Sequence, residues 1–308
     1  MITALGGGVG AAKFLEGLSR VISDEPLSVI VNTGDDIVLH GLRISPDVDT
    51  IIYRLSGLID AGKGWGVRDD TFTCLAALSR LGAETWFNIG DIDFATHIYR
   101  TRLRNEGFKP AEVTERLARA FGIKDSIKVI PMTDEDVETW ILTDEGDMHF
   151  QEYLVKRKMK PEVKKVAFRN IERAKPAPGV LEAIRDARMI VLCPSNPIIS
   201  IGPILNVKGI GEALRGADGK VIAISPLIGG VPLKGPADKL MRGLGLEVSS
   251  AGVARLYRDF LDVMVIDTED AGEAARISEM GIKPVVLDTL MSDAEKAATL
   301  ASAVLSEM

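Results

Sequence analysis

Short apolar runs, rich in β-branched residues, alternate along most of this chain with longer segments of helical periodicity. In the first of those segments, 11–22, Phe14, Leu15 and Leu18 fall on one helix face. The runs predicted as strands are 2–5, 27–31, 84–89, 189–193, 221–224, 263–266 and 284–287. Near-continuous apolar strands separated by helices indicate a parallel sheet covered on both faces. We therefore predict an α/β fold with a Rossmann-like, mainly parallel sheet and helices on both faces.

The middle of the chain departs from this alternation. Its patterns are typical of two helices followed by a β-hairpin, over residues 95–106, 110–121, 137–143 and 148–150. A basic segment and a Pro/Ala/Gly stretch then lead back into the alternation. We predict that 1–95 and 181–308 form the Rossmann-like core, and that 96–180 is an insertion of helices, β-hairpin and basic segment.

Charge and composition exclude several classes of protein. The 308 residues include 37 Lys+Arg and 44 Asp+Glu, a net charge of −7, which disfavours nucleic-acid binding because phosphates need clustered cations. The basic run 156–165 is interpreted as a solvated face, the alternative being that it helps to hold an anionic donor or a partner. No apolar run approaches the roughly 18 residues of a membrane span, and the N-terminus does not resemble a secretory signal.

The two cysteines, Cys74 and Cys193, are far apart and have no metal-binding spacing. We expect both to be buried free thiols in the reducing cytoplasm.

A glycine-rich loop, 6–10, lies between the first predicted strand and the first predicted helix. There, glycine lets backbone amides approach phosphate oxygens, and the helix dipole favours the anion. A tight turn without a ligand is the alternative, but four glycines in five residues exceed what a turn needs. The residues predicted to bind phosphate are Gly7, Gly8, Gly10 and Lys13.

The loop fits neither of two familiar nucleotide motifs fully. A Walker A loop requires Gly-Lys-Ser/Thr, whereas Lys13 stands between Ala12 and Phe14. NAD-binding folds carry an acid at the end of the second strand, where this chain has Asn32-Thr33. An NAD-dependent oxidoreductase is therefore disfavoured.

Carboxylates cluster after the second strand and in the segment 45–50, which opens a helix. Mg²⁺ prefers one or two carboxylates together with phosphate oxygens and water, so Asp36, Asp47 and Asp49 are predicted metal ligands. An extended segment would place Asp47 and Asp49 on the same side. The alternative for Asp49 is a helix N-cap.

Polar loops also follow the later strands. Ser195 and Asn196 lie in a Pro-Ser-Asn-Pro segment, for which a simple turn is the alternative to nucleotide binding. Gly229 and Gly230 are predicted as a second backbone cradle for phosphate, and His97 as a possible site residue.

Ten segments, taken in order, carry a resemblance to a known family. They are GGGVGAAK, NTGDD, SPDVDT, WGVRDDTF, WFNIGDIDFATH, IPMTDE, MHFQEYLV, PSNPIISIGPIL, SPLIGGVPLKGPADKLM and SSAGVARLYRDFLDVMVID. Over essentially its whole length the chain resembles the 2-phospho-L-lactate transferase (CofD) family.

The resemblance implies a reaction. A phospholactyl group, or in some relatives a phosphoenolpyruvyl group, moves from a guanosine-diphosphate-activated donor to the ribityl hydroxyl of a deazaflavin, 7,8-didemethyl-8-hydroxy-5-deazariboflavin. GMP leaves, and the product is the precursor of coenzyme F-420. The resemblance also implies dependence on Mg²⁺, and we expect a cytoplasmic homodimer.

Site residues carry over where positions match. Asp49 matches the aspartate that contacts the deazaflavin, and is the predicted catalytic residue. The other predicted deazaflavin contacts are Asn88, Asp91 and His97. Some relatives carry Lys at the position of Asn88, and Arg or Lys at that of Ile92, so both departures remove positive charge. The main alternative function is a CofD-like regulatory protein that binds a nucleotide sugar without catalysis.

Overall fold

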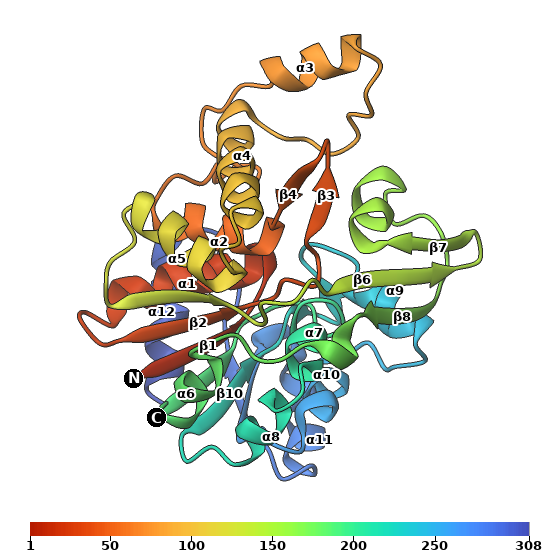
Figure 1. Ribbon diagram of the computed structural model, residues 1–308. Coiled ribbons are helices and arrows are strands. Elements are labelled where there is room, and N and C mark those ends of the chain that lie inside the picture. Colours follow the sequence, from red (N-terminus) through yellow and green to blue (C-terminus); the bar gives the residue numbers. More distant parts are fainter. Residues whose placement is uncertain (308) are drawn as a thin grey trace.

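A seven-stranded parallel sheet forms the centre of the computed structural model, which describes residues 1–307 (Figure 1). In spatial order its strands are β14 (Lys283–Leu287), β13 (Val263–Asp267), β10 (Lys220–Ile224), β9 (Met189–Leu192), β1 (Ile2–Gly6), β2 (Leu27–Val31) and β5 (Ile127–Pro131). Every neighbouring pair is parallel. The predicted Rossmann-like fold class is confirmed.

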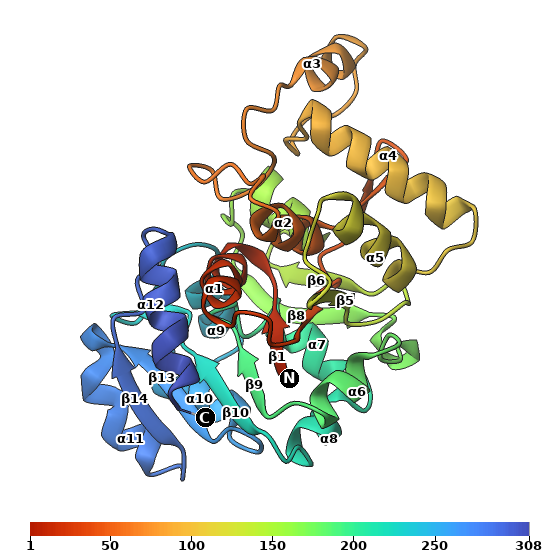
Figure 2. The ribbon, with the colours of Figure 1, turned by 90° about the vertical axis from the view of Figure 1, so that its left-hand side faces the viewer.

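Alternate residues of each strand enter two different cores, because successive side chains of a strand point to opposite faces. On β1, Ile2 and Ala4 pack with α1 (Gly8–Val21) and α12 (Ala294–Leu305), which run side by side in Figure 2. Leu5 joins the core of the opposite face. The helices of that face are α6 (Val180–Arg185), α7 (Ile201–Asn206), α8 (Ile210–Arg215), α9 (Ala237–Gly243), α10 (Ser250–Tyr257) and α11 (Ala274–Ser278).

The other elements of the first half of the chain lie on the β5 side of the sheet. They are β3 (Ile37–Leu39), β4 (Leu42–Ile44), α2 (Pro46–Leu55), α3 (Thr73–Arg80), α4 (Asp91–Asn105) and α5 (Pro110–Ala120), with α3 projecting furthest from the sheet (Figure 1). Helix α2 packs on α1, and α5 packs on β5. A separate antiparallel sheet contains β7 (Gly146–His149), β6 (Glu138–Thr143) and β8 (Val163–Arg169). The remaining elements are β11 (Leu227–Ile228), β12 (Val231–Pro232) and three short turns of helix, η1 (Glu152–Lys156), η2 (Ile171–Arg173) and η3 (Thr268–Glu273).

The structure corrects several sequence-based expectations. The predicted hairpin is present as β6 and β7, but the basic run contributes to a third strand, β8. The range 96–180 is not wholly an insertion, because it contains β5, an edge strand of the central sheet. Cys193 is buried as expected, whereas Cys74 is exposed on α3.

The predicted strand 84–89 is wrong, because this segment is an irregular loop. Its Ile89 is buried in a small separate cluster with Leu75 and Phe94. The apolar pattern there reflects that cluster and not a position in the sheet. Across residues 1–307, the structure contains no helix with the length and apolar character needed to cross a membrane.

Candidate functional site

The candidate site lies where the order of the strands reverses. From β1 the chain continues outward to β2 and β5 on one side, and then returns to β9, β10, β13 and β14 on the other. The loops after β1 and β9 therefore diverge at the sheet edge where ligands bind in such folds. A cavity of about 750 Å³ opens there, lined by both loops, by α2 and by the loops 225–236 and 289–292.

The glycine loop forms one wall of this cavity and is held against the loop that follows β9. Ser195 Oγ accepts a hydrogen bond from the Gly7 amide at 3.2 Å and donates one to the Gly7 carbonyl at 3.0 Å. A Cβ on Gly10 would lie 2.1 Å from the Pro194 carbonyl oxygen, so only glycine fits there. Gly8 adopts a φ of +74°, in the left-handed region that favours glycine.

The first turn of α1 begins in this loop, and its amides meet the cavity. Among the described residues, its N-cap Gly7 supplies no side-chain hydrogen bond and its first turn carries no acid. Amides at a helix N-terminus attract anions. The geometry therefore suits a phosphate, and Lys13 also lines the cavity one turn further along α1.

Two buried carboxylates line the cavity together with the glycine loop, and one of them, Asp47, is in direct contact with it. A Cβ on Gly7 would lie 2.0 Å from Asp47 Oδ2, and that oxygen accepts a hydrogen bond from Asn32 Nδ2 at 2.9 Å. Burial raises the pKa of Asp47 to about 6, although Asn32 and the Gly8 amide partly offset the effect. Burial, together with the charge of Asp47, also raises the pKa of Asp35. Asn32, which replaces the acid of NAD-binding folds, thus holds Asp47 in place.

These carboxylates fit a divalent cation. Asp35 Oδ1 is buried and has no hydrogen-bond partner within residues 1–307, and both acids would gain from a neutralising charge. The structure has no group of three or more His, Cys, Asp and Glu side chains placed to hold a metal, over the residues that it describes. Mg²⁺ does not need one, because phosphate oxygens and water complete its shell.

Asp36, a predicted ligand, lies elsewhere. It lines a smaller neighbouring cavity of about 140 Å³, where its Oδ2 accepts a hydrogen bond from Ser45 Oγ. Asp47 and Asp49 do line the large cavity, and Asp35, which was not predicted, accompanies them. The structure therefore favours Asp35 over its neighbour as a metal ligand. Asp47 and Asp49 also lie in the first turns of α2, and not on an extended segment as expected.

The position of Asp36 predicts a pH-dependent stability. Burial raises its pKa to about 8, so the folded protein holds a proton that the unfolded chain releases near pH 4. This contribution to the unfolding free energy is fully present below about pH 4. It falls as the pH rises from there and is lost once the pH passes the folded pKa of about 8. Between pH 6.5 and 8, we expect the parent to lose about 1 kcal/mol more unfolding free energy than Asp36→Asn, allowing for partial exposure. Urea unfolding in EDTA measures this, and parallel pH profiles would contradict it.

A buried ion pair lies behind the other wall of the cavity. Arg100 Nη2, on α4, pairs with Asp49 Oδ1, and His97 Nδ1 lies 3.7 Å from Asp49 Oδ2. That Oδ2 atom has no hydrogen-bond partner in the part of the chain that the structure describes. Burial lowers the pKa of His97 to about 4, so its ring is neutral at pH 7. Arg100 was not predicted, although it lies one helical turn from His97.

The remaining predicted residues divide between the cavity and other roles. Asn88 and His97 line the cavity, as do the aromatic residues Trp65 and Phe87. Asp91 does not, because its carboxylate accepts hydrogen bonds from the Thr73 and Cys74 amides at the start of α3. Its carboxylate thus has a structural role at the start of α3, and its deazaflavin contact stays a prediction.

Asn196 lines the cavity, but its Oδ1 accepts hydrogen bonds from the amides of Ile198 and Ile199 at 3.0 and 3.3 Å, which shape its own turn. Gly229 and Gly230 are the two turn residues of the β11–β12 hairpin, with φ of +59° and +74°. Two-residue hairpin turns of this kind require positive φ at both positions. The pair lies outside the lining of the cavity, so the hairpin turn accounts for both glycines, and the phosphate cradle predicted there stays a prediction.

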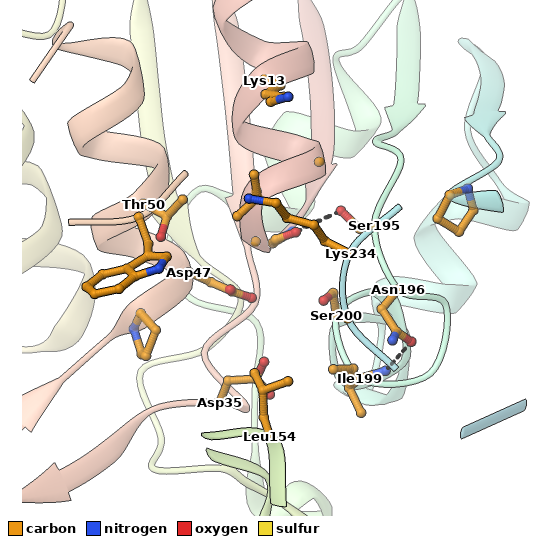
Figure 3. A pocket seen from close by; sticks show the side chains of 18 of the residues that line it. Lys13, Asp35, Asp47, Thr50, Leu154, Ser195, Asn196, Ile199, Ser200 and Lys234 are labelled. Carbon is orange, nitrogen blue, oxygen red and sulfur yellow. Dashed lines mark hydrogen bonds between the residues drawn. The ribbon is translucent and has the colours of Figure 1, made fainter. Parts of the chain in front are cut away.

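Lys234 also lines the cavity, and it was missed because nothing in its local sequence marks it as a ligand. Figure 3 shows Lys234 with Lys13, Asp47 and Ser195 around the same opening.

Comparison with known proteins identifies relatives over the whole chain. The sequence profile of the family described as 2-phospho-L-lactate transferase CofD matches residues 2–305. A 2-phospho-L-lactate transferase of Methanosarcina mazei is 43% identical over 298 residues, covering 97% of each chain. A phosphoenolpyruvate transferase of Streptomyces griseus is 42% identical over 306 residues, covering 97% of this chain and 96% of its own.

The fold itself recurs at low sequence identity. A crystal structure of a Bacillus halodurans protein superimposes with a TM-score of 0.66 at 17% identity, covering 99% of this chain and 98% of that one.

Proposed function

The chain belongs to the 2-phospho-L-lactate transferase CofD family, and we propose that its large cavity binds both substrates of this transfer reaction. The protein is a transferase of coenzyme F-420 biosynthesis. Its donor is lactate or enolpyruvate linked to guanosine diphosphate (the lactyl-2-diphospho-5'-guanosine type), and its acceptor is 7,8-didemethyl-8-hydroxy-5-deazariboflavin. The regulatory alternative is not favoured, since the relatives at 42–43% identity are transferases.

One observation carries the proposed arrangement of substrates. The glycine loop, the Asp35–Asp47 pair and Asp49 all face one cavity of about 750 Å³. Among the residues that line it, the glycine loop and Ser195 suit a phosphate, and Trp65, Phe87 and Asn88 suit an aromatic ring system. We assign the donor diphosphate to the first set of residues and the deazaflavin to the second. Asp47, packed on Gly7 and two residues from Asp49 on α2, connects them.

The chemistry that follows is a displacement at phosphorus. The acceptor hydroxyl oxygen attacks the phosphorus that carries the lactyl or enolpyruvyl group, and the bond to the bridging oxygen of GMP breaks. Asp49 Oδ2 accepts the hydroxyl proton as the new bond forms. Amides of the glycine loop bind the phosphate oxygens, and Asp35 and Asp47 would hold Mg²⁺. The cation, when bound, neutralises charge that develops on the diphosphate.

Three further features belong to this proposal. Dependence on Mg²⁺ is supported by the buried Asp35–Asp47 pair beside the phosphate loop. A cytoplasmic location agrees with two thiols that are both free in the structure. A homodimer would cover exposed apolar side chains such as Leu81, beyond α3, and Ile98 on α4, which are 84% and 56% exposed.

Product mass tests the proposed function. The protein is incubated with the deazaflavin, Mg²⁺ and each candidate donor in turn, and the product is weighed by mass spectrometry. We expect a product heavier than the deazaflavin by the phospholactyl or phosphoenolpyruvyl group, together with GMP. EDTA should abolish the reaction. If neither donor reacts, the assigned activity is wrong, and if EDTA has no effect, the role of Mg²⁺ is wrong.

A further inference from the structure

The β11–β12 hairpin carries a lysine to the rim of the cavity. Gly229 and Gly230 form its turn, and the chain then continues through Pro232 to Lys234. The base of the hairpin is fixed from below, because the Ser225 and Ser250 hydroxyls are 2.9 Å apart and Ser250 Oγ donates to Asp270 Oδ2 at 3.2 Å. The hairpin follows β10, so Lys234 reaches the cavity from the half of the sheet that lies on the other side of β1 from β2.

The ammonium group of Lys234 reaches the neighbourhood of the glycine loop. Its Nζ donates a hydrogen bond to the Lys63 carbonyl at 3.0 Å. A Cβ on Gly64 would lie 3.0 Å from this Nζ and also 3.0 Å from Val9 Cγ1, so the ammonium lies close to the first turn of α1. In Figure 3 the Lys234 side chain extends toward that end of the helix, between Lys13 and Asp47.

Lys13 approaches the same end of the cavity from α1. Its Nζ donates to the Met291 carbonyl at 2.8 Å. Within residues 1–307, neither Lys13 nor Lys234 forms an ion pair with a carboxylate. Burial lowers the pKa of Lys13, as do the charges of Arg54 and Lys234, and the nearby carboxylates of Asp293 and Glu16 only partly offset this. The backbone carbonyls that the two lysines contact accept hydrogen bonds but carry no negative charge. An anion bound between the two lysines would supply that charge.

We infer that Lys234 and Lys13 together bind the diphosphate of the nucleotide donor, Lys234 from the hairpin and Lys13 from α1, on either side of the glycine loop. This inference rests on the proposed function and adds to it a residue on a different segment of the chain. It also explains the hairpin, whose glycine turn serves to place a cation and not to contact phosphate itself. Diphosphate binding then replaces the hydrogen bond from Lys234 to the Lys63 carbonyl, which joins these two loops.

Calorimetric titration with GDP and Mg²⁺ tests the inference on the full-length chain. Lys234→Met and Lys13→Met should each weaken GDP binding at least about tenfold, since hydrogen bonds to charged groups are among the stronger ones. Lys234→Arg keeps the charge and should stay within about threefold of the parent. The affinity for the deazaflavin should not change in any variant. If the hairpin had only a structural role, the substitutions would weaken the binding of both GDP and the deazaflavin.

Lys239 provides a matched control, because its Nζ also donates to a backbone carbonyl, that of Met159 at 2.8 Å, but it lies outside the cavity lining. Lys239→Met should bind GDP as the parent does. If the parent binds GDP and Lys234→Met binds it equally well, this inference is wrong and the proposed function stands. If the parent itself does not bind GDP, both are wrong.

Discussion

Replacement of Asp49 by asparagine is expected to lower kcat/KM for the transfer by about 10²–10⁴-fold, the range found for a positioned general base. The change removes the carboxylate that accepts the acceptor proton in the proposed reaction. Asp49 lines the cavity, and its buried Oδ2 atom has no hydrogen-bond partner within residues 1–307, so its capacity to accept a proton is not already taken up by the protein. Steady-state rates at saturating donor, with the deazaflavin varied, measure the loss.

Asparagine is the informative substitution because Asp49 also neutralises Arg100. Alanine would leave the Arg100 guanidinium, which is only 5% exposed, without its carboxylate partner. Removing one member of a buried ion pair typically costs about 3–5 kcal/mol, so inactivity of Asp49→Ala could reflect unfolding. The asparagine side chain keeps an oxygen for Arg100, and circular dichroism should show a folded protein.

Asp91→Asn is the matched control for the Asp49 experiment. Both acids match motifs of the family, but Asp91 accepts hydrogen bonds at the start of α3 and lies outside the cavity lining. Its substitution should leave the transfer rate within a few-fold of the parent. A fully active Asp49→Asn would rule out the role assigned to that carboxylate, and an inactive, folded Asp91→Asn would show that α3 takes part in the reaction.

The fold was largely predictable because local patterns determine it. The strand predicted at 27–31 coincides with β2, whose five residues are all buried, so a continuous apolar run is the expected signal. The same kind of signal produced the error at 84–89. Phe87 and Ile89 are apolar because they pack around Leu75 and Phe94, and not because they belong to the sheet. β5 was missed because its position in the sheet depends on pairing with β2, about a hundred residues earlier.

The site was only partly predictable because it depends on contacts between distant segments. The glycine loop carries its own signal in its spacing. In contrast, the choice between Asp35 and Asp36 depends on which side of the turn after β2 each carboxylate occupies. Arg100 and Lys234 gain their roles from Asp49 and from the α1 terminus, which are far away in the sequence. No local pattern could assign them.

Gly10→Ala is expected to destabilise the protein by about 1–3 kcal/mol, the usual cost of overpacking, and to weaken GDP binding. The added Cβ would lie 2.1 Å from the Pro194 carbonyl oxygen, which is backbone and cannot rotate away. The glycine loop and the loop after β9 must therefore separate. Because Ser195 joins these loops through Gly7, their separation also displaces the amides proposed to bind phosphate.

Gly211→Ala separates this steric effect from the general effect of replacing a helical glycine. Gly211 lies in α8, where an added Cβ would meet no atom closer than 3.7 Å. Alanine should therefore be neutral or stabilising there, by up to about 1 kcal/mol, because it is the better helix former. Urea unfolding and GDP titration of both variants measure the contrast. Parent-like stability and affinity in Gly10→Ala would mean that the two loops can move apart freely, and that their close contact does not define the nucleotide site.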